Sequence, residues 1–251
     1  MHKIFTNTLF IGKEVHYMPF CHSTNDIAAD LVRNSQLKEG AVVITDNQTS
    51  GKGQRGNLWE SNPNSNLTFS LVLKPHFLDV SEQYFLNIAI SLALHDFLSQ
   101  YMGEGIRIKW PNDLYFYDNK LGGILIENGI KKNQLEYAIV GIGLNINQKK
   151  FHAPNATSLS LACGQDFDLE EVLPLLLHAL ESRYIQLKKV QFTRLLEEYY
   201  QKLYWMHEKH LFKGLDYFEG TIQGIDKTGR IIISTHEKNY HFNIKEVKFI
   251  R

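Results

Sequence analysis

The chain has 251 residues, 43% of them hydrophobic and 22% charged, and its 27 basic and 27 acidic residues give a formal net charge of +0. This is an ordinary globular composition, and the lack of a net field disfavours a dedicated nucleic-acid-binding or membrane-binding protein. The two cysteines, Cys21 and Cys163, are too few for a disulfide framework and predict free thiols in a reducing cytoplasm.

The N-terminal segment, residues 1–7, lacks the long apolar core of a signal peptide, and no apolar run reaches membrane-spanning length. We therefore expect a cytoplasmic protein. The first helix is expected to begin at Ser23, because Ser23 with Asp26 fits a capping box and apolar residues then recur at helical spacing as far as Val32.

Periodicity and turn residues predict the remaining elements of the larger part of the chain. Strands are expected at residues 41–45, 67–73, 106–110, 114–117, 122–127 and 135–142, and helices at residues 81–101, 169–188 and 192–202. A turn at Asp118-Asn119 joins two of these strands into a hairpin.

The pattern changes near His210 to short strands separated by tight turns. These strands are expected at residues 220–226, 230–234, 240–243 and 247–249. They predict a small β-barrel, which buries too little surface to stand alone and should dock on the larger domain. We place the boundary within residues 205–212, which gives domains 1–208 and 209–251.

Residues 51–59 carry three glycines, two cations and a tryptophan. Glycine permits close backbone approach, Lys52 and Arg55 suit phosphate oxygens, and Trp59 offers a flat face for a ring. The segment matches the dinucleotide pattern G-x-G-x-x-G, but an Asn- and Ser-rich loop follows where that fold needs a helix. Walker A and protein-kinase signatures are absent. The remaining alternative is a flexible surface turn with incidental charges.

Two further segments place polar residues at the ends of elements. The triplet that begins at Ser23 (Ser-Thr-Asn) either caps a helix or grips a small polar head group. Residues 109–113 (Lys-Trp-Pro-Asn-Asp) end a strand in a stiff turn. Their amide and carboxylate either make Asx-turn bonds or handle phosphate, ribose and a metal ion.

Paired and alternating glycines mark two strands. Gly122 and Gly123 follow Lys120, which lies either beside a gap in the sheet or in water. In residues 141–147 (Gly-Ile-Gly-Leu-Asn-Ile-Asn) the glycines either make room for a neighbouring aromatic side chain or open the backbone to a bound ring, with Asn145 as an amide partner.

Other catalytic patterns are missing from the sequence. No G-x-S-x-G elbow occurs, and no Cys–His pair stands out. His207 and His210 lack metalloprotease spacing and further ligands, so we expect no structural metal site.

Together, in this order and spacing, the five segments resemble the biotin protein ligases, also called biotin–[acetyl-CoA-carboxylase] ligases, from about Pro19 to the end of the chain. The resemblance implies an α+β fold: a class II aminoacyl-tRNA synthetase-like core, with a mainly antiparallel sheet flanked by helices, and a C-terminal SH3-like β-barrel. It also implies synthesis of biotinyl-5′-AMP from biotin and MgATP, and transfer of biotin to a lysine of a carrier domain. ATP and Mg²⁺ then act as co-substrate and ion, with no tightly bound cofactor.

The resemblance also assigns residues by position. Those implied near biotin are Ser23, Thr24, Asn25, Gln48, Lys52, Gly53, Gln54 and Lys120. Those implied near ATP and the adenylate are Gly51, Lys52, Arg55, Trp59, Asn112 and Asn145. Lys120, Lys109 and Asp113 are the candidate catalytic residues.

The glycine-rich segment departs from the family pattern Gly-Arg-Gly-Arg-x-Gly-Arg. Lys52, Gln54 and Asn57 stand where that pattern has arginines, so we expect weaker retention of the adenylate. Because the Ser-Thr-Asn triplet begins at Ser23, we expect no DNA-binding winged-helix domain. Some relatives form homodimers through a sheet edge, and a homodimer is compatible with this sequence. The alternatives are a lipoate or octanoate ligase of the same fold and a non-catalytic biotin or nucleotide sensor.

Overall fold

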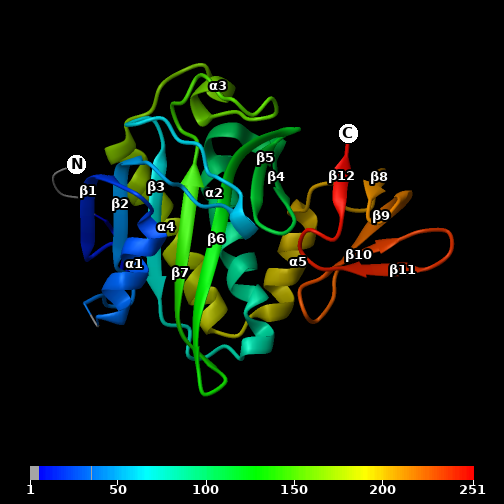
Figure 1. Ribbon diagram of the computed structural model, residues 1–251, viewed down its shortest axis with the longest axis horizontal. Helices are drawn as coiled ribbons and strands as arrows, with labels where there is room; N and C mark the ends of the chain where they lie inside the picture. Colours follow the sequence, from blue (N-terminus) through cyan, green and yellow to red (C-terminus); the bar gives the residue numbers. More distant parts are fainter. Residues whose placement is uncertain (1–5, 35) are drawn as a thin grey trace.

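The computed structural model describes residues 6–34 and 36–251, apart from the side chain of Arg55 (Figure 1). Within these residues a seven-stranded sheet has the order β1-β2-β3-β7-β6-β5-β4. Its strands are β1 (Val15–Cys21), β2 (Val42–Gln48), β3 (Leu67–Leu73), β4 (Ile106–Lys109), β5 (Asp113–Phe116), β6 (Asn119–Lys131) and β7 (Gln134–Leu144). Only the β1–β2 pair of this described sheet is parallel, so the sheet is mainly antiparallel, as predicted.

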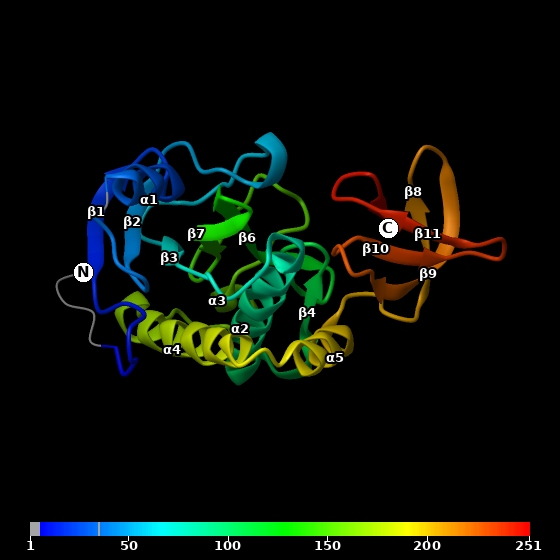
Figure 2. The same cartoon turned by 90° about the horizontal axis from the view of Figure 1, so that it is seen from below.

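Helices cover the two faces of this sheet unequally. Helices α2 (Tyr84–Met102) and α4 (Leu169–Lys188) lie on one face, and α1 (Thr24–Arg33) lies on the other (Figure 2). The remaining helices are α3 (Leu159–Cys163), α5 (Phe192–Lys202) and the 3₁₀ turns η1 (Gln54–Gly56), η2 (Val80–Glu82) and η3 (Gly103–Gly105). The predicted α+β class is therefore confirmed. Among the described residues, no helix is long and apolar enough to cross a membrane.

Strand periodicity explains why one face of the sheet is left open for a site. In β3, Phe69 and Leu71 pack in the core beneath α2 and α4, whereas Thr68 and Ser70 point to the opposite face. In β7 the opposite face carries glycines at residues 141 and 143. This face is thus small and polar at the centre of the sheet, and it leaves space above it.

A second described sheet of five antiparallel strands has the order β11-β10-β9-β8-β12. It comprises β8 (Lys209–Lys213), β9 (Tyr217–Ile225), β10 (Ile231–Ser234), β11 (Asn239–Phe242) and β12 (Lys248–Ile250). It packs on the larger part of the chain: Trp110 donates its indole N–H to Gly229 O at 3.1 Å, and the Tyr200 hydroxyl meets Ile225 N and O at 3.1 Å each.

Several elements differ from the sequence-based expectations. β1 and α3 were not predicted, because β1 is a partly exposed edge strand without clean alternation and α3 has only five residues. The hairpin turn is at residues 117–118, since Tyr117 adopts the left-handed conformation and donates its N–H to Gly105 O at 2.9 Å. The second helix begins at Tyr84, after the turn η2, and not at residue 81.

A buried carboxylate holds the N-terminal segment against α4. Glu181 is 4% exposed and accepts the backbone N–H groups of Leu9, Phe10 and Ile11 at 2.7, 2.8 and 2.9 Å. Burial disfavours the charged form, but the three N–H groups outweigh it and lower the pKa of Glu181 below its ordinary value.

Glu181→Gln is expected to destabilise the protein by about 1–3 kcal/mol at neutral pH, because buried N–H groups lose their carboxylate acceptor. A depressed folded-state pKa contributes stability that is present above the unfolded value of about 4.3 and is lost as the pH falls through the folded-state pKa. Urea unfolding of wild type and variant should therefore give a gap at pH 7 that narrows below about pH 4. Glu171→Gln, on the exposed side of the same helix, is the control. A gap that does not narrow in acid would contradict this account.

Candidate active site

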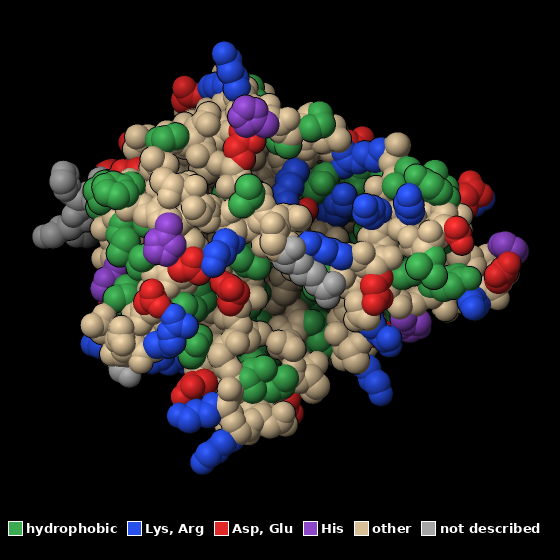
Figure 3. All heavy atoms as spheres, in the orientation of Figure 1, with side chains coloured by type: hydrophobic (Ala, Val, Ile, Leu, Met, Phe, Trp, Pro, Cys, Tyr) green, Lys and Arg blue, Asp and Glu red, His purple; other side chains and the backbone are tan. Residues whose placement is uncertain are grey.

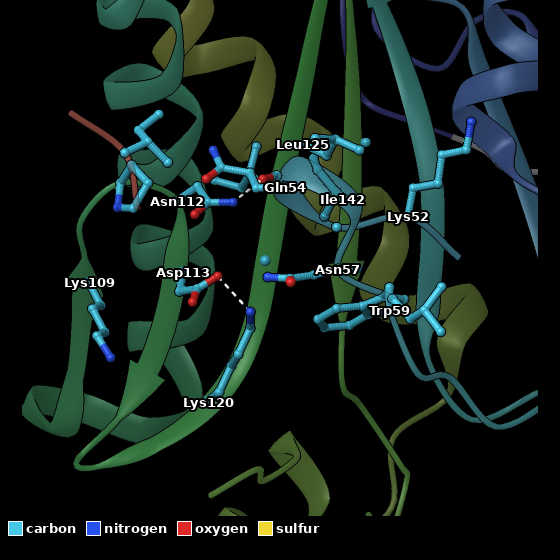
Figure 4. A pocket seen from close by; sticks show the side chains of 18 of the residues that line it. Lys52, Gln54, Asn57, Trp59, Lys109, Asn112, Asp113, Lys120, Leu125 and Ile142 are labelled. Atoms are coloured by element: carbon cyan, nitrogen blue, oxygen red, sulfur yellow. Dashed lines mark hydrogen bonds and ion pairs between the residues drawn. The ribbon is translucent and has the colours of Figure 1, made fainter. Parts of the chain in front are cut away.

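A cavity of about 980 Å³ opens on the small, polar face of the seven-stranded sheet. Its walls come from the start of α1, the segment of residues 48–59, the β4–β5–β6 hairpins and the C-terminal sheet. Figure 4 shows residues of the second and third of these walls. Figure 3 shows this hollow near the centre of the molecule, with lysine and arginine side chains gathered around it. The volume is at the upper end of the roughly 300–1,000 Å³ of small-molecule sites, so more than one small substrate fits.

Tight turns bring the charged residues of the central wall together. The three-residue connection 110–112 places Lys109 opposite Asp113 in the β4–β5 register, and Asp113 is opposite Gly123 of β6. Lys120 then reaches Asp113 with an Nζ–Oδ1 distance of 2.7 Å (Figure 4). A Cβ on Gly123 would lie 3.4 Å from Asp113 and 3.5 Å from both Lys120 and Trp59, so this glycine opens a gap among the three.

The alternating glycines of β7 make room for the chain's own side chains. A Cβ on Gly143 would overlap the Trp59 indole, and one on Gly141 would overlap the Asn25 amide. Of the two interpretations of this pattern, the structure therefore favours a neighbouring aromatic side chain. The ammonium group of Lys120 lies 5.7 Å from the centre of the Trp59 ring, within cation–π range.

The polar triplet at residues 23–25 combines capping with cavity lining. Ser23 is the N-cap of α1 and accepts the N–H of Asp26 at 3.4 Å, while Thr24 donates its N–H to Gln48 Oε1 at 2.8 Å. Ser23 and Thr24 are at most 3% exposed, yet both line the cavity. This end of the cavity thus offers uncharged donors and acceptors at fixed positions.

The rest of the cavity is strongly cationic in an otherwise neutral protein. Among the described residues, its lining carries five lysines and one carboxylate, Asp113. The lysines are Lys52, Lys109, Lys120, Lys245 and Lys248. Lys52 forms an ion pair with Asp26 of α1 at 2.6 Å, so it is held at the rim. Such a lining favours a ligand with several negative charges.

Lys109 is the most perturbed of these cations. Its ammonium group lies 4.7 Å from the Tyr115 ring centre and 4.9 Å from that of Phe249. Burial between these rings lowers the pKa of Lys109 to about 8, with Arg251 and Lys120 adding to the shift and Asp113 opposing it. An anionic ligand would reverse part of this shift.

The structure brings most of the predicted site residues to one cavity. Those that line it are Ser23, Thr24, Asn25, Gln48, Lys52, Gly53, Gln54, Trp59, Lys109, Asn112, Asp113 and Lys120. Gly51 and Asn145 do not line it. Gly51 permits close approach of Trp59 O, and Asn145 donates its side-chain N–H to Thr157 O at 3.0 Å. The side chain of Arg55 lies outside the described residues.

Sequence reasoning missed the wall that the C-terminal sheet contributes. Lys245, Lys248 and Phe249 line the cavity, although more than 100 residues separate them from its other walls. Their sequence predicted only a short strand, so nothing local indicated a site. Among the described residues, no group of three or more His, Cys, Asp or Glu side chains is arranged to hold a metal.

Comparisons with known proteins agree with this geometry. A sequence model of the biotin/lipoate A/B protein ligase family matches residues 17–145. The chain is 30% identical over 238 residues to the bifunctional ligase/repressor BirA of Bacillus subtilis, covering 92% of this chain and 72% of that protein. It is also 30% identical over 247 residues to the chloroplastic biotin–protein ligase 1 of Arabidopsis thaliana, covering 91% of this chain and 65% of that protein.

A solved structure gives the same result. The biotin protein ligase of Aquifex aeolicus in complex with biotin and ATP superimposes with a TM-score of 0.79 at 26% identity, over 95% of this chain and 99% of that one. The chain therefore belongs to the biotin/lipoate A/B protein ligase family. Within that family, the relatives from Arabidopsis thaliana and Aquifex aeolicus are biotin protein ligases.

Phe249→Ala is expected to raise the pKa of Lys109 from about 8 toward its ordinary value, because water then reaches the ammonium group. NMR titration of isotopically methylated lysines would measure both values. Phe242→Ala, a ring substitution elsewhere in the same sheet, should leave the Lys109 titration in place. A wild-type Lys109 that titrates above pH 10, or a pKa unchanged in Phe249→Ala, would contradict the assignment.

Proposed function

We propose that this protein is an ATP-dependent biotin–protein ligase that forms biotinyl-5′-AMP and transfers biotin to a lysine of a biotin carrier domain. The observation that carries the proposal is a single cavity with an uncharged polar end at residues 23–25 and a cationic wall around the Lys120–Asp113 pair. The Aquifex aeolicus relative of the same fold binds biotin and ATP, which supports the same two substrates here.

The first step joins two anions, the biotin carboxylate and the α-phosphate of ATP. The carboxylate oxygen attacks phosphorus and pyrophosphate leaves, so charge builds up where the substrates meet. Lys120 and Lys109 offset this repulsion from the β4–β5–β6 wall, and Lys52 does so from the rim. Mg²⁺ would enter as the complex with ATP. In this wall Asp113 has a carboxylate oxygen and Asn112 an amide oxygen, and these would suit the one or two protein ligands that nucleotide-bound Mg²⁺ takes.

The second step transfers biotin from the adenylate to an amine. The carrier lysine must arrive uncharged, attack the mixed anhydride and expel AMP. Asp113 is the carboxylate placed to position this amine or to accept its proton, because it lies beside Lys120 in the cavity wall. Residues 52–54 and 57–59 line the cavity, and this segment would keep water from the anhydride.

The setting of this activity follows from the same proposal. Its partner is the carrier domain of a biotin-dependent carboxylase in the cytoplasm, and neither DNA nor membrane binding is part of the function. A homodimer remains compatible with the fold. The alternatives are a lipoate or octanoate ligase and a non-catalytic sensor. The similarity to biotin protein ligases favours the biotin–protein ligase over both alternatives.

One assay separates the three functions. The purified protein is incubated with MgATP, a carrier domain and either biotin or lipoate, and the carrier is read by intact mass. We expect a carrier mass increased by one biotinyl group and no lipoylation. Lipoylation would favour the alternative ligase, and an unmodified carrier would favour the sensor.

Asp113→Ala is expected to slow transfer from preformed biotinyl-AMP by roughly 10²–10⁴-fold, the usual contribution of a positioned acid or base. Adenylate formation, followed separately by pyrophosphate release, should also slow, because Lys120 loses its partner at 2.7 Å. Asp30→Ala, at the exposed end of α1, is the control. Transfer at the wild-type rate from preformed adenylate would exclude a role for Asp113 in the second step.

Gln54→Arg is expected to slow the dissociation of biotinyl-AMP by about tenfold, because the variant restores a charge that pairs with the phosphate. Gln54 belongs to η1 and lines the cavity, so the new side chain would start at the cavity wall (Figure 4). The dissociation rate would be measured by chase with unlabelled adenylate. No slowing in the variant would count against the proposed effect of the altered loop.

A further inference from the structure

A chain of hydrogen bonds runs from the surface to the uncharged end of the cavity. It begins at Glu127 on β6, whose Oε2 accepts the side-chain N–H of Asn25 at 2.7 Å. Asn25 Oδ1 in turn lies 2.6 Å from the Ser70 hydroxyl, which is 2.8 Å from the Thr24 hydroxyl. Glu127 is exposed and does not line the cavity, whereas Ser70 is 0% exposed and Thr24 lines the cavity.

The chemistry of these groups fixes the direction of every bond in the chain. A carboxylate only accepts, so the Asn25 amide must turn its NH₂ toward Glu127 and its oxygen toward Ser70. The main-chain oxygen of Leu125, at 3.4 Å, supports the same orientation more weakly. An amide oxygen cannot donate, so the single proton of Ser70 is committed to Asn25.

The direction then passes to the group that meets the ligand. With its own proton committed, Ser70 can only accept from Thr24. Thr24 therefore donates its proton to Ser70 at 2.8 Å in preference to Gln48 Oε1, which lies farther away at 3.3 Å. The remaining lone pair of the Thr24 hydroxyl makes it an acceptor toward the cavity. Next to it, Gln48 Oε1 accepts the backbone N–H of Thr24. The NH₂ group of Gln48 therefore points away from that bond and can act as a donor.

Gly141 keeps this arrangement in place. A Cβ at residue 141 would overlap Asn25 Oδ1, so only glycine lets the amide lie against β7. The result is an acceptor at the buried Thr24 beside a donor at the half-buried Gln48. This pair complements a cyclic urea, which has an N–H next to a carbonyl oxygen.

We propose that Glu127 is a positioning residue for the ligase reaction: it sets the direction of the Asn25–Ser70–Thr24 hydrogen bonds and so makes Thr24 an acceptor for a ureido N–H of biotin. The inference rests on the proposed function, because it concerns the recognition of that substrate. Glu127 touches neither substrate nor reacting atoms. Its effect is on biotin affinity and not on ATP.

Two substitutions at residue 127 distinguish the direction of the hydrogen bonds from the mere change of side chain. Glu127→Gln can still present a carbonyl oxygen to Asn25, so its biotin Kd should stay within about threefold of wild type. Glu127→Lys can only donate, which favours the reversed amide and turns Thr24 into a donor. Its biotin Kd, measured by calorimetry, should rise by about tenfold with the ATP Kd unchanged, since the loss is that of one ligand hydrogen bond.

A double-mutant cycle with Ser70→Ala separates the effect of the hydrogen-bond chain on biotin affinity from the direct effect of the charge that Glu127→Lys introduces. Ser70 is the middle link, so Ser70→Ala should itself weaken biotin by about tenfold, and Glu127→Lys should then add less than about twofold. Glu136→Lys, an exposed site on β7, is the matched control and should leave biotin affinity unchanged.

A tenfold effect of Glu127→Lys that persists in the Ser70→Ala background would overturn the proposal, as would equal losses in Glu127→Gln and Glu127→Lys or no loss in either. These outcomes presuppose a wild-type protein that makes biotinyl-AMP. A wild type that makes none fails the proposed function itself, and the two failures are thus distinct.

Discussion

The structure depends on a single electrostatic constraint: two anions must meet in a protein whose net charge is zero. The β4–β5–β6 hairpins meet this constraint locally. Their short turns fix Lys109, Asp113 and Lys120 side by side. The ion pair between Lys120 and Asp113, at 2.7 Å, holds the Lys120 ammonium group beside the space that Gly123 leaves in the cavity wall. Because the cations are fixed in advance, little reorganisation is needed when charge develops.

The two faces of the large sheet have different roles: one forms the hydrophobic core and the other forms the floor of the cavity. Helices α2 and α4 bury the apolar face, which forms the core. The other face carries glycine, serine and threonine at its centre, and these small residues admit Asn25, Trp59 and the cavity itself. The C-terminal sheet forms the remaining wall of the cavity. Its Phe249 ring lies near the Lys109 ammonium group and shields that group from water.

Local sequence signals predicted much of this fold. The bounds of β3, α4 and α5 match the expected residues, because apolar periodicity and capping or turn residues coincide there. Of the site, the motifs at strand ends and at the start of α1 were predictable, since their residue types exceed what a turn or cap needs. Ser70, Glu127 and Phe249 were not, because their roles arise only when distant strands pair or the second sheet docks.

Isotope exchange between pyrophosphate and ATP tests the central claim most directly, because it reports attack of a carboxylate on the α-phosphate without any carrier. Wild-type protein should incorporate labelled pyrophosphate into ATP only when biotin is present, and not with lipoate. In Lys120→Ala the biotin-dependent exchange should fall by about 10²-fold or more, as on loss of a group that stabilises transition-state charge. Exchange that is absent, that is independent of biotin, or that is undiminished in Lys120→Ala would contradict the account.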